Sequence, residues 1–203
     1  MELKAVVEKM KNRGFLAEYC RNAEEARARA LEIIGSRSVG IGGSVTVRTL
    51  GIADALKEKN IPVYWHWLVD KSETKAERGR AIAADVYMCS ANALLEDGRI
   101  VNVDGTGNRA AGVIYGPDTV IMVIGKNKLV AGSSIDEAIT RVKNSACAKN
   151  AIRQGFDTPC AKTGKCVDCR CPQRMCCVTF IHETPLKCQK AFHVLLVDEE
   201  LGL

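Results

Sequence analysis

Short runs of β-branched and aromatic residues alternate with helix-forming segments along most of the chain, and this alternation limits the available folds more than any other feature. Residues 119–124 are apolar or β-branched throughout, as expected for a strand that is buried on both faces. Similar strands are predicted at 38–41, 61–67, 86–89, 100–103, 178–181 and 193–197. Strands that alternate with helices predict a three-layer, Rossmann-like α/β sandwich with a mainly parallel central sheet.

Helices are predicted between these strands. The first is indicated by an apolar stripe with helical spacing, formed by Leu3, Val6, Val7 and Met10. Further helices are predicted at 17–34, 46–59, 106–115 and 135–154, and another is predicted to end near residue 84. Ser134 is the expected N-cap of the helix over 135–154. The turn signal at 96–99 predicts a hairpin-like return between the strands at 86–89 and 100–103.

The chain of 203 residues is long enough for one well-cored domain, which is expected to span residues 1–203. No apolar run reaches the length of about 18 residues that a membrane span needs, and the N-terminus lacks a secretory signal. A cytoplasmic protein without membrane partners is therefore expected. The net charge of +5 and the aromatic content of 5% argue against nucleic acid binding. A homodimer is the default expectation for the oligomeric state.

Cysteine is the strongest chemical signal, because six of the ten cysteines lie between residues 160 and 177. In a cytosolic protein such a cluster indicates a metal or redox site rather than disulfides, since cytosolic thiols stay reduced. A Cys-x2-Cys turn lets two thiolates meet one metal, and two further cysteines complete the set. The predicted metal-binding segment is 158–178, and its preferred ligands are Cys160, Cys166, Cys169 and Cys176.

The spacing leaves the metal and part of the ligand set open. Cys171 and Cys177 are alternative ligands, and His182 and Cys188 are weaker candidates downstream. Four thiolates around either Zn²⁺ or a [4Fe–4S] cluster would leave the site with a charge of about −2. Basic residues would offset that charge, because the stretch 141–174 holds eight Lys or Arg and two Asp.

Two further segments lie where predicted strands end, which is the edge at which open α/β sheets bind ligands. Glycines at 40–43 would let backbone N–H groups approach an anion, and residues 102–109 combine a carboxylate, amides, a hydroxyl and a guanidinium. The alternative is a pair of ordinary turns, with Asp104 as a helix cap. The predicted catalytic base is Asp104, and the predicted ligand-binding residues are Gly42, Gly43, Ser44, Thr46, Asn92, Gly105, Thr106, Asn108 and Arg109.

Several of these blocks resemble the lactate-utilisation (LUD) domain family. The most specific is Asp104-Gly105-Thr106-Gly107-Asn108-Arg109; others are Gly42-Gly43-Ser44-x-Thr46, Ser90-Ala91-Asn92-Ala93-Leu94, Tyr115-Gly116-Pro117 and Gly125-x-Asn127-Lys128. The pattern Pro159-Cys160-x5-Cys166-x2-Cys169 is similar to the standalone, cysteine-bearing branch of that family. Cys147 departs from the family pattern, which favours proline at this position.

The resemblance implies a fold like that of ribose-5-phosphate isomerase, glucosamine-6-phosphate deaminase and the CoA-transferases. Domains of that group bind phosphorylated sugars or CoA near glycine loops. The resemblance also implies a link to iron–sulfur systems that oxidise lactate to pyruvate. Because this sequence shows no ferredoxin-type domain and no evident flavin site, we expect it to act with a redox protein partner rather than alone.

Three functions are compatible with these features. The first is an accessory redox component of lactate or organic-acid utilisation, with a [4Fe–4S] cluster and a crevice for a small anionic metabolite. The second is an isomerase- or transferase-like enzyme that acts on a sugar phosphate or a CoA-type ligand. In that enzyme zinc would be structural and Asp104 would transfer the proton. The third is a ligand-sensing or assembly subunit without chemistry.

Overall fold

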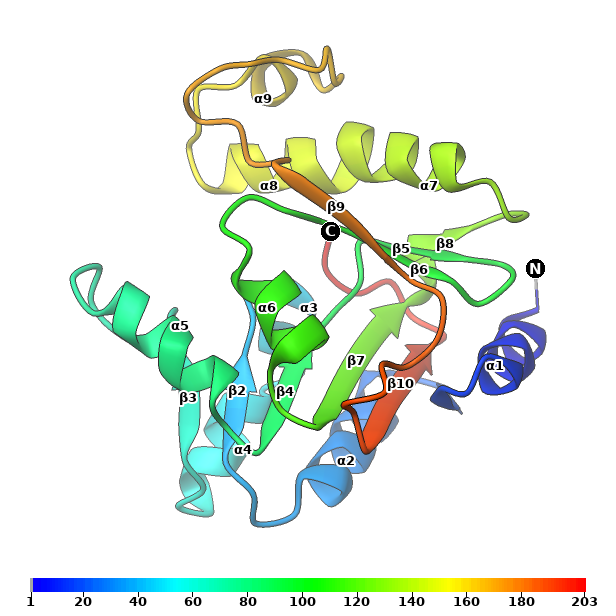
Figure 1. Ribbon diagram of the computed structural model, residues 1–203, viewed down its shortest axis with the longest axis vertical. Coiled ribbons are helices and arrows are strands. Elements are labelled where there is room, and N and C mark those ends of the chain that lie inside the picture. The colour runs from blue at the N-terminus through cyan, green and yellow to red at the C-terminus, as the bar shows by residue number, and fades with distance from the viewer. Residues whose placement is uncertain (1) are drawn as a thin grey trace.

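The computed structural model describes residues 2–203, and Figure 1 shows a central sheet with helices on both of its faces. Six parallel strands form this sheet in the order β1-β10-β7-β4-β2-β3. The strands are β1 Leu16–Cys20, β2 Val39–Ile41, β3 Val63–Trp65, β4 Val86–Cys89, β7 Thr119–Gly125 and β10 Ala191–Val197. The predicted Rossmann-like α/β architecture with a mainly parallel sheet is confirmed.

Alternate side chains of the central strands enter two separate apolar cores. Ile121 and Val123 of β7 pack on one face with helices α2, α3 and α4. Val120, Met122 and Ile124 pack on the opposite face with α1, α5, α6 and a second sheet. These helices are α1 Leu3–Asn12, α2 Ala23–Ile34, α3 Val45–Thr49, α4 Ile52–Glu58, α5 Thr74–Ile82 and α6 Asn108–Tyr115.

The second sheet has four short strands in the order β8-β5-β6-β9, namely β5 Ala93–Leu95, β6 Ile100–Asp104, β8 Leu129–Val130 and β9 Val178–His182. Its outer face packs against α7 (Ile135–Arg141) and a π-helical turn (Val142–Cys147), and α8 (Ala148–Arg153) continues from that turn. Figure 1 shows α7 and α8 lying across this sheet, with α9 (Pro159–Thr163) beyond them. Among the described residues, no helix combines the length and the apolar character that crossing a membrane requires.

The structure corrects three of the predicted elements. The helix predicted over 17–34 begins only after Asn22, whose side chain accepts the Glu25 N–H, and the residues before it form β1 beside β10. The helix predicted over 46–59 is divided into α3 and α4, because Gly51 adopts a left-handed φ of 61°. The hairpin joins β5 to β6, whereas β4 pairs with β2 and β7 in the central sheet.

Candidate functional site

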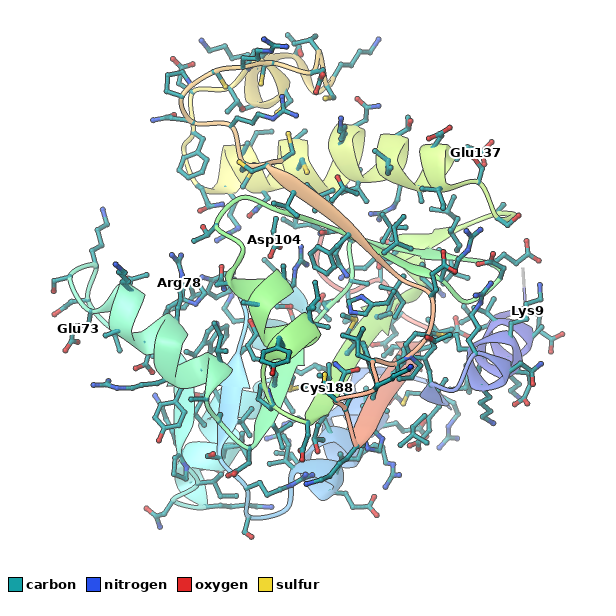
Figure 2. All side chains as sticks on the ribbon, viewed as in Figure 1. Lys9, Glu73, Arg78, Asp104, Glu137 and Cys188 are labelled. Carbon is teal, nitrogen blue, oxygen red and sulfur yellow. The ribbon has the colours of Figure 1, made fainter. Side chains whose placement is uncertain are left out.

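A polar crevice of about 470 Å³ opens where β2, β4 and β6 end. Figure 2 shows Arg78 from α5 and Asp104 at the end of β6, and both residues line this crevice. Gly42 is not part of the lining, since it packs against Tyr87, where an added Cβ would lie 3.0 Å from the phenol oxygen. The other predicted crevice residues all line it: Gly43, Ser44, Thr46, Asn92, Gly105, Thr106, Asn108, Arg109 and Asp104.

Asp104 and Arg109 are bound to each other and to the surrounding backbone. The Arg109 Nε–H donates to Asp104 Oδ1 at 2.9 Å, and the Ala110 N–H donates to Asp104 Oδ2 at 2.8 Å. The same guanidinium donates to two backbone carbonyls and to Asn92 Oδ1. These contacts use four of its five N–H groups, so Arg109 holds the crevice wall and retains one donor for a ligand. Asp104 acts here as a helix cap and an ion-pair partner.

A buried lysine, Lys128, lies between α3 and the residue that follows β4. Lys128 is only 2% exposed, and its Nζ donates to Thr46 Oγ1 at 2.8 Å and to Ser90 Oγ at 2.6 Å. Burial, reinforced by the positive charges of Arg109 and Arg141, lowers the pKa of Lys128 to about 7. The crevice therefore contains an amine that is largely neutral slightly above neutral pH.

Positive charge dominates the crevice. Among the described residues its lining has a single acidic side chain, Asp104, and five basic ones: Arg78, Arg109, Lys128, Arg153 and Arg174. The Arg78 Nε–H is buried without a hydrogen-bond partner in the described structure, and Arg153 lies 5.0 Å from the centre of the Trp67 ring. His66 adds no charge near neutral pH, because burial and the nearby Arg78 lower its pKa to about 4. Such a lining favours a small anion.

The four predicted metal ligands line a second, smaller pocket, which also receives Cys147, Lys143 and Arg174. Cys171 and Cys177 are not in this lining, and Figure 2 places Cys188 far from the cysteine segment, near the base of β10. His182 is buried in β9 between two phenylalanine rings. Within residues 2–203, no three His, Cys, Asp or Glu side chains come close enough together to hold a metal ion. The metal centre therefore stays a prediction.

The cysteine loop is held in shape by specific hydrogen bonds. The Asp168 N–H donates to Cys166 Sγ at 3.4 Å across the Cys-x2-Cys turn, and Asp168 adopts a left-handed φ of 46°. The Arg174 guanidinium donates to the carbonyls of Cys169 and Cys176. The pKa of Cys169 is lowered because the Cys171 backbone N–H and thiol donate to it, whereas burial raises the pKa of Cys176.

The crevice and the cysteine pocket share a wall, because Cys147, Arg174 and Met175 line both of them. The backbone approaches closely here, since a Cβ added to Gly105 would lie 2.8 Å from the carbonyl oxygen of Met175. The next residues join the sheet, with the Cys177 N–H donating to the Asp104 carbonyl at 2.9 Å and β9 pairing with β6 from there. The cysteine segment is therefore built directly onto the crevice.

The sequence model of the LUD domain matches residues 3–197. The chain belongs to the LUD domain family. This family is associated with lactate utilisation, and the resemblance noted in the sequence is confirmed. The structure is similar to the crystal structure of a DUF162 family protein from Deinococcus radiodurans, with a TM-score of 0.53 and 14% identity, over 96% of this chain and 95% of that chain. At this identity the similarity shows the fold alone. A comparison with curated proteins gives no match.

The sequence patterns did not predict Arg78, Arg153, Lys128 or Cys147 of this LUD-domain protein as site residues, yet each of them lines one or both pockets. Arg78 and Arg153 lie on helices α5 and α8, so only tertiary packing directs them to the ends of the strands. Lys128 follows β7 and matches the family pattern, but nothing local indicates that it is buried. Cys147 did carry a signal, because it departs from the family pattern at the position that lines both pockets.

Proposed function

We propose that this LUD-domain protein is an accessory redox component of lactate or related organic-acid utilisation. In this proposal the cysteine segment binds a [4Fe–4S] cluster, and the crevice binds a small anionic metabolite. The observation that carries the proposal is the wall shared by the crevice and the cysteine pocket, formed by Cys147, Arg174 and Met175. A cluster and an anion bound on its two sides would be close neighbours.

The donor set and the charges around the cysteine pocket support this part of the proposal. Cys160, Cys166, Cys169 and Cys176 surround one pocket, and Lys143 and Arg174 beside them would offset a charge of about −2. Thiolates spread around a pocket suit a cluster, in which each thiolate binds a different iron, better than zinc, whose four sulfurs lie about 2.3 Å from a single point. A bound cluster would supply one-electron transfer.

The remaining residues would position the ligand and support the thiolates. Arg78 and Arg153 would attract and orient an anion, because they bring positive charge to a crevice in which Asp104, the one acidic side chain among the described lining residues, is already paired with Arg109. Arg174 would hold the cysteine loop against the crevice through the carbonyls of Cys169 and Cys176. The Asp168 N–H would stabilise the Cys166 thiolate, since hydrogen bonds to ligand sulfurs tune such centres.

The isomerase- or transferase-like alternative fits this geometry less well. A cationic crevice would also accept a sugar phosphate or a CoA-type ligand. However, the base on which that alternative depends, Asp104, has one carboxylate oxygen bound to Arg109 and the other to the Ala110 N–H. Both oxygens of this carboxylate therefore already accept a hydrogen bond from the protein, in a place where a general base would receive a proton from its substrate.

The cluster is tested by purifying the full-length protein under anaerobic conditions and measuring iron, zinc, acid-labile sulfide and the visible spectrum. We expect about four iron and about four sulfide per chain with a broad visible band. Cys166→Ser and Cys169→Ser should lose most of the iron, whereas Cys171→Ser and Cys177→Ser are matched controls that should keep it. Zinc without sulfide would favour the alternative enzyme, and a metal-free protein would contradict both.

The crevice is tested by calorimetric titration with lactate, pyruvate and ribose 5-phosphate. Arg153→Ala and Arg78→Ala should weaken binding of the preferred anion, because both remove positive charge from the lining. Lys75→Ala is a matched control, since Lys75 is an exposed residue on the same helix as Arg78 and is outside the lining. If Arg153→Ala and Arg78→Ala bind the anion as tightly as the wild type and Lys75→Ala do, the anion-binding role of the crevice is refuted.

A further inference from the structure

Lys128 is placed to act as a reactive amine. It ends a short 3₁₀ turn (Lys126–Lys128) after β7 and lines the crevice from its buried side. The hydroxyls of Thr46 and Ser90, to which its Nζ is bound, each donate their own proton to a backbone carbonyl, at 3.2 Å and 2.6 Å. Both hydroxyls can therefore only accept a hydrogen bond from Lys128.

This arrangement matches a neutral amine, which has two N–H bonds and one lone pair, better than an ammonium, which has three N–H bonds. The two hydroxyls accept both N–H bonds of the neutral form. Within residues 2–203, Nζ has no third acceptor and no carboxylate within ion-pair distance, so an ammonium would leave a buried donor unmet.

The charged groups around Lys128 also favour its neutral form. Arg109 from α6 and Arg141 from α7 face the amine and disfavour a further positive charge, and the Cys89 thiol of β4 opposes them. That thiol is fully buried, and its own pKa is raised to about 12 by burial, so it carries no charge near neutral pH. Among the described residues, none of the groups that act on Lys128 is an anion that would stabilise its charged form near neutral pH.

We propose that Lys128 is the nucleophile of the crevice and forms an imine with a carbonyl compound that carries an anionic group, specifically a 2-oxo acid. This inference rests on the anion-binding crevice of the proposed function and names its substrate class. The Nζ lone pair attacks the carbonyl carbon, a C=N bond replaces the C=O bond, and the two amine protons leave with the carbonyl oxygen as water. The step involves no change of oxidation state, so it needs no oxidant or reductant.

The basic residues of the lining would hold the anionic group while the amine reacts. Arg78 supplies a buried Nε–H without a partner in the described structure, and Arg153 supplies charge on the same crevice. A sugar phosphate in its open-chain form has the same two features, a carbonyl and an anionic group. The probes are therefore pyruvate for the 2-oxo acid class and ribose 5-phosphate for the sugar phosphate class.

The full-length protein is incubated with each probe and sodium cyanoborohydride, which reduces an imine to a stable secondary amine. Intact mass and peptide mapping then show whether an adduct forms and on which residue. We expect one pyruvate adduct per chain on Lys128, and at least about tenfold less of it in Lys128→Met. Lys126→Met is the matched control, because Lys126 is an exposed lysine of the same turn, and it should be labelled like the wild type.

Peptide mapping of the wild type keeps the test decisive even if Lys128→Met folds poorly. No adduct with either probe, or adducts only on exposed lysines, would overturn the inference. An adduct on Lys128 with ribose 5-phosphate alone would overturn the 2-oxo acid class and support the nucleophilic amine. An adduct in a protein that lacks iron and sulfide would support this inference and refute the cluster, whereas a cluster without an adduct would do the reverse.

Discussion

Replacing Lys128 by methionine tests the buried amine through stability instead of chemistry. The pKa of Lys128 is about 7 in the folded chain because of its burial, against about 10.4 for a lysine in an unfolded chain. Between these two values the unfolded chain binds one more proton than the folded chain, so the free energy of unfolding rises with pH. The rise from this group is about 2.5 kcal/mol between about pH 7.5 and about pH 9.5. Lys128→Met should lack this rise.

The assay is urea unfolding of the full-length wild type and of Lys128→Met at both pH values, under reducing anaerobic conditions. The two proteins share every titratable group except Lys128, so the contributions of the shared groups cancel in the difference. Lys126→Met is the control, because Asp198 raises the pKa of Lys126 and this lysine is charged in both states throughout the range. Equal pH dependence for the wild type and Lys128→Met would refute the neutral buried amine.

Two further substitutions test the crevice wall. Arg109→Ala should destabilise the fold by about 3–5 kcal/mol in urea unfolding, because it leaves the buried Asp104 carboxylate without its partner; a loss below about 1 kcal/mol would contradict the structural role of this pair. Gly105→Ala should cost about 1–3 kcal/mol and lower the iron content expected from the proposed cluster, because its Cβ would meet the Met175 carbonyl oxygen at 2.8 Å. Wild-type stability and metal content in this variant would show that the two segments do not pack as described.

The inner strands β2, β4 and β7 of the central sheet were predictable, because they are buried on both faces and appear in the sequence as short apolar runs. Residues 119–124 illustrate this, since every one of them is buried in β7. Leu16–Cys20 was not predictable, because Leu, Ala and Glu favour a helix locally and only pairing with β10 makes this segment a strand. The second sheet was also missed as a separate layer, because strands as short as Ala93–Leu95 carry little periodicity.

The crevice was predictable to the extent that its residues lie at the ends of strands. The residues at the ends of β4 and β6 that were identified from that position and from their polar side chains or glycine backbone all line the crevice, namely Asn92, Asp104, Gly105, Thr106, Asn108 and Arg109. Their roles were less predictable, because Arg109 looks like an anion-binding residue in sequence, while the fold uses four of its donors internally. The burial of Lys128 depends on hydroxyls from two distant segments, Thr46 and Ser90, and no local pattern reports it.

The strand order of the central sheet has a consequence for the nascent protein. β10, the last strand of the described chain, lies between β1, which is made first, and β7, which is made midway. During synthesis on the ribosome, the facing edges of β1 and β7 therefore stay unpaired until residues 191–197 emerge. Phe192, Val194 and Leu196 then complete one core, and Leu195 and Val197 complete the other. Pairing between strands so far apart in the sequence slows folding, and the central sheet is completed only late in synthesis. Until then the exposed strand edges make the incomplete chain prone to aggregation, so we expect it to depend on chaperones.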